Sequence, residues 1–327
     1  MSETKARIAV LTSGGDAPGM NAAVRAVVRA GIAAGMEMFG VRHGYKGLMA
    51  GDFIPLGARE VGGIIERGGT VLGTSRCEPF RTEAGQAQAV GRLKAMRIDG
   101  LIVIGGNGSQ AGALALAQHG VRVIGIASTI DNDLAGSDVT LGATTALDIA
   151  LEAIDRLRVT ASAHGRVFLV EVMGRRCGYL ALLAGIAGGA EAIVIPEDEL
   201  SPEDVATAIH AAYRRGKSHA VVLVAEGARH DADALARYFT EHVERLGFEL
   251  RITKLGHVQR GGAPHSFDRI YASNLGAAAI EHLQTGAHGV LLGLTGGQIS
   301  ATPLGALAGM HKTLDPRLIR LAHVLAQ

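Results

Sequence analysis

The sequence of 327 residues lacks tryptophan, has only two cysteines and carries no excess of charge of either sign. Its 32 basic residues against 31 acidic ones leave a net charge of +1, so we expect no nucleic-acid or membrane-surface partner and favour small-molecule ligands. Cys77 and Cys177 have no metal-ligand spacing. We therefore expect reduced, unpaired thiols and a cytoplasmic protein.

Long apolar runs are also missing. The N-terminus continues from Arg7 into a short apolar run, without the longer stretch of a secretion signal, so we do not expect export. The segment Cys177–Ala190 is shorter than the roughly 20 residues of a membrane span and predicts a buried helix. Glycine, by contrast, is abundant at 46 residues, which suggests tight turns and close backbone approaches to a ligand.

The length suggests two domains, because a domain holds about 150 residues. Short β-branched runs alternate with helical patterns, as in parallel strands joined by crossover helices. The predicted strands are Ile8–Leu11, Leu101–Ile104, Val121–Ile126, Val167–Val172, Ala192–Ile195 and Ala220–Val224. Helices are predicted from Leu147 to Leu157 by apolar spacing, and from Ser201 to Gly216 by an N-cap and early acids. No change of composition marks a domain boundary, which we place near Leu141.

Two glycine-rich loops follow predicted strands and precede helical patterns. Leu11–Asn21 reads LTSGGDAPGMN, and Ile104–Ser109 reads IGGNGS, with a helix predicted from Ala111. Glycines let backbone N–H groups approach an anion, and a helix N-terminus adds positive charge, so each loop predicts a phosphate site. The alternative for the first loop is a plain glycine-rich turn. The second loop also permits a dinucleotide interpretation with Asp131 as the ribose acid, although that signal is weak, and no Walker-type string is present.

The string Thr129-Ile130-Asp131-Asn132-Asp133 directly follows the buried apolar run Val121–Ala127. The end of such a strand is the sheet edge where α/β proteins bind ligands. Two carboxylates there can take a proton from an alcohol or hold a metal that bridges phosphates. Alternatively, these residues only form the next turn.

Basic residues lie at the ends of predicted strands. Arg166 precedes one strand, Arg175 and Arg176 follow it, and His257 and Arg260 lie in a glycine-rich turn. Guanidinium groups match phosphate oxygens, so the set suggests a phosphorylated substrate, although any single one could be a solvated surface group. Two glycine loops, a carboxylate pair and several arginines suit phosphoryl transfer, whereas a dehydrogenase would need only one loop.

These strings occur in family order and spacing, and the chain resembles bacterial ATP-dependent 6-phosphofructokinase over essentially its whole length. The segments that carry the resemblance are Thr12–Asn21, Thr129–Asp133, Val172–Arg175 and Gly256–Gly262. The resemblance implies transfer of the γ-phosphoryl group of ATP to the 1-hydroxyl of fructose 6-phosphate, a step of glycolysis, with Mg²⁺. It also implies a homotetramer with shared active sites.

The fold implied is two Rossmann-like three-layer α/β domains with mainly parallel sheets. We expect a nucleotide-binding domain of residues 1–141 plus about 258–308. A sugar-phosphate-binding domain would comprise residues 142–257 plus about 309–327.

Motif matching assigns expected roles to individual residues. Asp131 would be the base that accepts the hydroxyl proton, with Thr129 beside it and Arg175 near the transferring group. Nucleotide contacts would come from Gly15, Arg76, Cys77, Gly106, Asn107, Gly108 and Ser109. Substrate contacts would come from Thr129, Asp131, Met173, Gly174, Arg175, Glu226, His257 and Arg260, with Arg166 and Arg251 reaching in from a neighbouring subunit. Mg²⁺ would be held by Asn107 and Asp133.

The resemblance also implies an effector site for ADP or phosphoenolpyruvate between subunits. The residues matched are Arg25, Arg29, Arg158, Gly189, Glu191, Arg215 and Lys217. Ala58 stands where the family pattern has a further arginine, although Arg59 is adjacent. The alternative is a set of ordinary surface cations.

Several positions depart from the family pattern. Asn107 replaces the usual magnesium-binding aspartate, so metal binding should weaken unless Asp133 or Asp131 compensates. Cys77 replaces an aromatic residue near the adenine. Pyrophosphate-dependent relatives typically carry aspartate at the position of Gly108 and lysine at that of Ser128, so the residues present favour ATP. A pyrophosphate-dependent enzyme and a non-catalytic sugar-phosphate or nucleotide-binding subunit stay open as alternatives.

Overall fold

The computed structural model describes residues 5–326, which divide into two compact α/β units. Unit 1 contains residues 5–145 and 260–312, and unit 2 contains residues 146–259 and 313–326. Each unit is therefore assembled from two segments that are far apart in the sequence.

Unit 1 is built on a seven-stranded sheet of order β11-β10-β5-β4-β1-β2-β3. β1, β2, β4, β5 and β10 are parallel, whereas β3 and β11 pair antiparallel at the two edges. The strands are β1 Arg7–Thr12, β2 Glu37–Val41, β3 Phe53–Pro55, β4 Gly100–Gly105, β5 Val123–Ala127, β10 Val290–Thr295 and β11 Gln298–Pro303. β4 and β5 are buried along their whole length, as expected for parallel strands covered on both faces.

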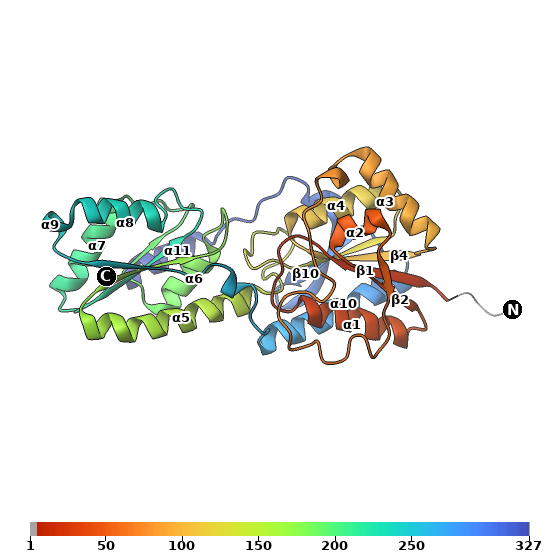
Figure 1. Ribbon diagram of the computed structural model, residues 1–327, viewed down its shortest axis with the longest axis horizontal. Coiled ribbons are helices and arrows are strands. Elements are labelled where there is room, and N and C mark those ends of the chain that lie inside the picture. Colours follow the sequence, from red (N-terminus) through yellow and green to blue (C-terminus); the bar gives the residue numbers. More distant parts are fainter. Residues whose placement is uncertain (1–4, 327) are drawn as a thin grey trace. The chain divides into compact units, whose positions relative to one another are not determined.

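Helices cover both faces of this sheet (Figure 1). α1 Met20–Ala33 and α10 Ser266–Gln284 pack against each other on one face, where Gly276 allows close approach. The other face carries α2 Gly44–Ala50, α3 Glu83–Ala95 and α4 Asn107–Gln118, together with the 3₁₀ turns η1 Glu78–Arg81 and η3 Leu304–Leu307.

Unit 2 contains a four-stranded, fully parallel sheet of order β7-β8-β6-β9. The strands are β6 Val167–Val172, β7 Ala192–Val194, β8 Ala220–Ala225 and β9 Leu250–Lys254. The remaining elements are α5 Ala143–His164, α6 Tyr179–Gly188, α7 Pro202–Arg214, α8 Ala232–Glu241, α9 Val243–Leu246, η2 Gly256–Gln259 and α11 Pro316–Leu325. Val205 and Ile209 of α7 and Leu235 of α8 pack on the apolar side chains of β6 and β8. In Figure 1, α5 and α6 lie on the opposite face of the sheet from α7 and α8, and α11 packs against α6.

The predicted α/β class with mainly parallel sheets is confirmed, and every predicted strand is present. The predicted helix at Ser201 is also confirmed: Ser201 and Asp204 form a capping box, and the helix ends at Arg214. Three helix predictions had the wrong bounds. α5 covers Ala143–His164 rather than only Leu147 to Leu157. α4 begins at Asn107 rather than Ala111, and α6 covers only Tyr179–Gly188 of the predicted Cys177–Ala190. Within residues 5–326, none of the helices combines the length and apolar character that a membrane crossing requires.

Candidate active site

The two glycine-rich loops lie against each other in unit 1, after β1 and β4. The Ser13 N–H donates to the Ile104 carbonyl over 3.0 Å. A Cβ at Gly105 would come within 2.4 Å of the Ser13 carbonyl oxygen, and one at Gly14 would lie 3.1 Å from Ser109 Oγ. Glycine at position 105 is therefore required by the close approach of the two loops.

The second loop leads directly into the N-terminus of α4. Gly106 is the N-cap residue and has no side chain that could accept the first N–H groups of the helix. Asn107 and Gly108 are exposed, whereas Ser109 is buried. An exposed helix start with this geometry can receive a phosphate group, as the sequence predicted.

Sequence reasoning passed over Gln110, a buried residue beneath the second loop. Its Nε2 donates to the carbonyl groups of Gly105 at 2.9 Å and Ile126 at 3.2 Å, and so connects the ends of β4 and β5. Gly125 makes room for this side chain, since a Cβ there would lie 2.1 Å from Gln110 Oε1. A glycine in the middle of the apolar β5 run was the one available signal.

The predicted catalytic segment borders the second glycine loop. Thr129 and Asp131 are buried, and the Asp131 N–H donates to Thr129 Oγ1 over 3.2 Å. A Cβ at Gly106 would lie 3.2 Å from Thr129 Cβ. Asn107 Nδ2 lies 3.4 Å from the carbonyl oxygen of Asp133. The structure therefore brings together the predicted base and both predicted metal-binding residues.

Arg260 connects Asp131 with the first glycine loop. Its Nη2 lies 3.9 Å from Asp131 Oδ1, and its Nη1 donates to the Asp16 carbonyl over 3.0 Å. A Cβ at Gly15 would approach Arg260 Nη1 to 2.5 Å. The Arg260 guanidinium therefore places a positive charge beside the carboxylate and the loop.

The residues predicted to bind Mg²⁺ offer suitable oxygen atoms. Among residues 5–326 there is no cluster of three or more His, Cys, Asp or Glu side chains that could hold a metal ion. Mg²⁺ does not need such a cluster, because it commonly keeps several waters and binds one or two carboxylates together with substrate phosphates. The partly exposed Asp133 carboxylate and the adjacent Asn107 amide fit that coordination chemistry.

The predicted nucleotide residues Arg76 and Cys77 lie in the segment before η1. Thr74 Oγ1 donates to the Gly14 carbonyl over 2.7 Å and so holds this segment beside the first loop. Arg76 is exposed, and the partly buried Cys77 Sγ lies 3.6 Å from Met49 Sδ.

Tyr45, which was not among the predicted site residues, contacts the second glycine-rich loop through its hydroxyl group. Its hydroxyl donates to the Ser109 carbonyl over 2.6 Å, and its ring stacks on Phe80 with centroids 4.1 Å apart. Burial raises the pKa of Tyr45. The hydroxyl therefore stays protonated and continues to donate at all ordinary pH values.

In unit 2, predicted substrate residues occupy the turn that follows β6. Arg175 is exposed and has a φ of 52°. Glu226 Oε1 accepts from the N–H groups of Gly174 at 3.3 Å and Arg175 at 2.8 Å. The Met173 N–H donates to Gln259 Oε1 over 2.9 Å. Glu226 and Gln259 therefore fix the backbone of the turn, and Gln259 was absent from the predicted set.

The remaining predicted substrate residues of unit 2 lie elsewhere. Arg166 precedes the first residue of β6, and Arg251 pairs with Phe168 on the neighbouring strand β9. Both guanidinium groups approach Glu249 Oε2, at 3.9 Å and 3.2 Å respectively. The two arginines therefore lie together at the opposite end of β6 from Met173–Arg175. His257 is exposed in η2.

The predicted effector residues divide between unit 1, which carries Arg25 and Arg29 on α1, and unit 2, which carries Arg158, Gly189, Glu191, Arg215 and Lys217. Within unit 2, Arg158 Nη2 donates to the carbonyl groups of Gly188 and, at 3.0 Å, Gly189. Lys217 Nζ lies 2.6 Å from the buried Glu191 carboxylate. The structure therefore groups the unit 2 cations near α6 and β8, with contacts already made to protein oxygens.

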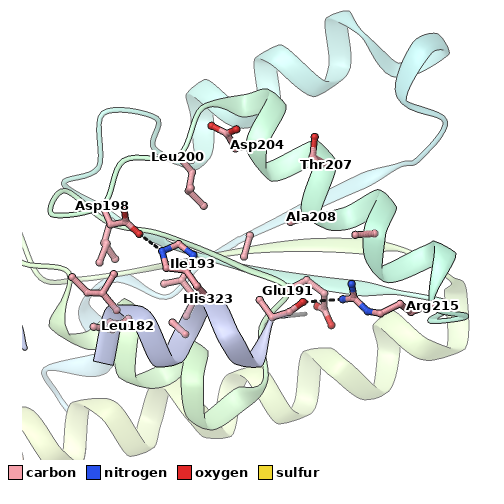
Figure 2. Close-up of a pocket in the computed structure, with 16 residues that line it drawn as sticks. Leu182, Glu191, Ile193, Asp198, Leu200, Asp204, Thr207, Ala208, Arg215 and His323 are labelled. Carbon is pink, nitrogen blue, oxygen red and sulfur yellow. Dashed lines mark hydrogen bonds and ion pairs between the residues drawn. The ribbon is translucent and has the colours of Figure 1, made fainter. Parts of the chain in front are cut away.

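A cavity of about 300 Å³ in unit 2 adjoins these residues (Figure 2). Its apolar lining includes Leu182, Ile193, Ile195, Leu200 and Ile319. Arg215 Nη2 donates to the Ala326 carbonyl over 2.8 Å, and His323 Nε2 lies 2.7 Å from Asp198 Oδ2. These polar contacts hold α11 over the cavity.

Comparisons with known proteins agree with this arrangement. Residues 7–283 match the family model described as Phosphofructokinase. The chain is 52% identical over 322 residues to ATP-dependent 6-phosphofructokinase 1 of Thermus thermophilus, covering 98% of this chain and 99% of that protein. It is 50% identical over 322 residues, with the same coverage, to an ATP-dependent 6-phosphofructokinase of Thermotoga neapolitana. The structure of phosphofructokinase from Saccharomyces cerevisiae matches with a TM-score of 0.86 at 36% identity, covering 98% of this chain and 48% of that chain.

Proposed function

The chain belongs to the phosphofructokinase family, and we propose that it is an ATP-dependent 6-phosphofructokinase of glycolysis. The reaction transfers the γ-phosphoryl group of ATP to the 1-hydroxyl of fructose 6-phosphate and yields fructose 1,6-bisphosphate and ADP. One observation carries the proposal beyond family membership. Two glycine loops, the Asp131 carboxylate and the Arg260 guanidinium meet within unit 1.

Asp131 acts as the general base in this proposal. It accepts the proton of the 1-hydroxyl while that oxygen attacks the γ-phosphorus and the bond to the bridging oxygen of ADP breaks. Thr129, whose hydroxyl accepts from the Asp131 N–H, fixes the backbone of the base. The positive charges of Arg260 and Arg175 stabilise the negative charge on the transferring group.

The nucleotide phosphates bind at the glycine loops and the start of α4. Gly108 leaves space there, because a Cβ at this position would have no neighbour within 4 Å. Ser128 is buried and donates to the Leu141 carbonyl over 3.3 Å, so it offers no cation to pyrophosphate. Both features favour ATP. Mg²⁺, held by Asn107 and Asp133, would neutralise charge on the phosphate oxygens.

The unit 2 residues that we propose bind the sugar phosphate are Met173, Gly174, Arg175, Glu226 and His257. Arg166 and Arg251 are separated from the turn after β6 by the length of a six-residue strand, roughly 20 Å. This separation supports the expectation that they serve the site of a neighbouring subunit in a homotetramer. Binding of ADP or phosphoenolpyruvate at the effector residues, and the cytoplasmic location, stay predictions.

A coupled assay tests the proposal, with ATP and pyrophosphate offered separately to the purified protein with fructose 6-phosphate and Mg²⁺. We expect turnover with ATP and a loss of about 10²–10⁴-fold in kcat for Asp131→Asn. Asp138→Asn is the matched control, an exposed aspartate of the same loop, and should leave kcat unchanged. Turnover confined to pyrophosphate would refute the donor, and full activity of Asp131→Asn would refute the base. Binding of fructose 6-phosphate by calorimetry without turnover would indicate a non-catalytic subunit.

A further inference from the structure

Asn132 lies between the two aspartates of the catalytic segment in an unusual backbone conformation. It has a φ of 51°, and its side chain is only 2% exposed. Asparagine adopts this left-handed conformation more readily than most residues because its side chain can form local hydrogen bonds. The chain turns at this residue. The backbone conformation of Asn132 therefore sets the relative positions of Asp131 and Asp133, from which the two carboxylates extend.

Hydrogen bonds to Thr140 hold this conformation. Asn132 Oδ1 accepts from the Thr140 N–H over 2.9 Å, and Thr140 Oγ1 donates to the Thr129 carbonyl over 2.6 Å. Asn132 Nδ2 also donates to the Asp138 carbonyl over 3.2 Å. Thr140 is fully buried. One threonine therefore contacts the residues on both sides of Asp131 in the sequence, Thr129 and Asn132.

The base of the loop is anchored independently of Thr140 Oγ1. The Leu141 N–H donates to the Ala127 carbonyl over 3.0 Å, and the Gly142 N–H donates to Asp268 Oδ1 over 2.8 Å. Loss of the threonine hydroxyl would therefore leave both ends of the loop attached. Its effect should be concentrated on the part of the loop that carries the carboxylates.

From this geometry we propose that Asn132 and Thr140 are a positioning pair for Asp131. They hold the base at the correct distance from the sugar hydroxyl by fixing the backbone at Thr129 and Asn132. The inference rests on the proposed function, because positioning is measured through phosphoryl transfer. Neither residue belongs to the predicted site set, and neither is assigned contact with substrate.

Thr140→Val is the decisive substitution, because it conserves shape and the backbone N–H while removing the hydroxyl. We expect kcat to fall about 10- to 100-fold, since a shift of about 1 Å in a catalytic group costs this much, with KM for both substrates within about twofold. Thr140→Ser restores the hydroxyl and should return kcat to within about threefold of wild type.

Ser137→Ala is the matched control. Ser137 is also a buried hydroxyl of this loop, but its hydrogen bonds go to the Val139 carbonyl at 2.6 Å and the Leu294 N–H at 2.9 Å. It should lower the unfolding midpoint while leaving kcat unchanged. If Thr140→Val and Ser137→Ala affected kcat equally, the pair would have no special role and the proposal would be wrong.

A second variant covers the case in which Thr140→Val does not fold. Asn132→Gly tolerates the positive φ but removes all three side-chain hydrogen bonds of Asn132, and it should show the same loss of kcat. Wild-type kcat in Asn132→Gly or in Thr140→Val would overturn the inference, as would failure of both variants to fold, which would show a role in folding alone. Wild-type turnover tests the proposed function separately.

Discussion

Asp268 of unit 1 and Glu203 of unit 2 are acidic side chains held in different ways. In unit 1, Asp268 is completely buried and accepts from the N–H groups of Gly142 at 2.8 Å and Thr145 at 2.9 Å, and from the Thr145 hydroxyl at 2.6 Å. In unit 2, the Glu203 side chain is 52% exposed and pairs with Arg245, itself 53% exposed. A buried carboxylate that accepts from backbone N–H groups fixes a chain segment, whereas exposed ion pairs typically contribute about 0–1 kcal/mol.

This contrast has a consequence for function. Gly142 directly precedes α5 and Thr145 lies in its first turn, so the buried Asp268 carboxylate fixes the C-terminal end of the loop that carries Asp131. The Glu203–Arg245 pair instead connects α7 with α9 on the surface of unit 2. We therefore expect substitution of the buried Asp268 to affect catalysis and stability together, and substitution of the exposed Glu203 or Arg245 to affect neither strongly.

Asp268→Ala should produce the largest effect. The substitution leaves two buried backbone N–H groups without this acceptor. Each unsatisfied group costs roughly 1–3 kcal/mol, so we expect the free energy of unfolding to fall by about 3 kcal/mol or more. Urea unfolding followed by circular dichroism measures the change, and Asp268→Asn, which keeps one acceptor oxygen, should lie between the alanine variant and wild type. If Asp268→Ala lowered the free energy of unfolding less than Arg245→Ala does, the buried carboxylate would not be the stronger of the two contacts.

Glu191 of unit 2 resembles Asp268 in being buried and in accepting a hydrogen bond from a backbone N–H group. It is 4% exposed, and Oε2 accepts from the Val221 N–H over 2.6 Å. Glu191→Ala should therefore cost about 1–3 kcal/mol. Lys217→Ala removes the half-exposed ion-pair partner but leaves the Val221 N–H bond to Glu191 in place, so it should lower the free energy of unfolding less than Glu191→Ala does. Equal unfolding midpoints for the two variants would show that burial is not the deciding property.

Adding a carboxylate to the exposed edge of unit 1 should have a smaller effect on stability. Asn107 is the first residue of α4, and Asn107→Asp should add about 0.3–1 kcal/mol through the positive end of the helix. The new charge should also lower the Mg²⁺ concentration for half-maximal binding several-fold, measured by calorimetry in the presence of ADP. Unchanged Mg²⁺ affinity would show that position 107 does not bind the metal, with Asp138→Asn as the control for general charge effects.

The elements that sequence predicts well are those buried on both faces. β4, β5 and β8 are continuous apolar runs because helices cover both sides of each sheet. β9 was missed, as were β2, β3, β10 and β11; in β9 the exposed residues Arg251, Ile252 and Lys254 interrupt the apolar pattern. The strand pattern therefore records burial rather than extended backbone as such.

The residues of the candidate site also differ in how well the sequence predicts them. Its glycine loops and aspartates form contiguous strings, which predict a phosphate site without any tertiary information. The supporting residues have no such local signal: Tyr45 reaches Ser109 across 64 positions, and Gln259 reaches Met173 across 86. Only folding brings these partners together, so a single sequence indicates which side chains can do chemistry but not which ones hold them in place.

The pH dependence of the Glu203–Arg245 pair should be the smallest effect and tests the other side of the comparison. Hydrogen bonds from Arg245 and then Tyr238 lower the pKa of Glu203 from its ordinary value of 4.5 to about 2. Because the pKa is lower in the folded state, the stabilisation is fully present above pH 4.5 and is lost as pH falls from 4.5 towards 2. Urea midpoints of wild type and Arg245→Ala should differ slightly at pH 6, converge near pH 2 and also converge in 1 M salt at about a 3 Å Debye length. A large difference at pH 6 that disappears in 1 M salt would contradict the small expected effect and show that unit 2 relies on surface charge.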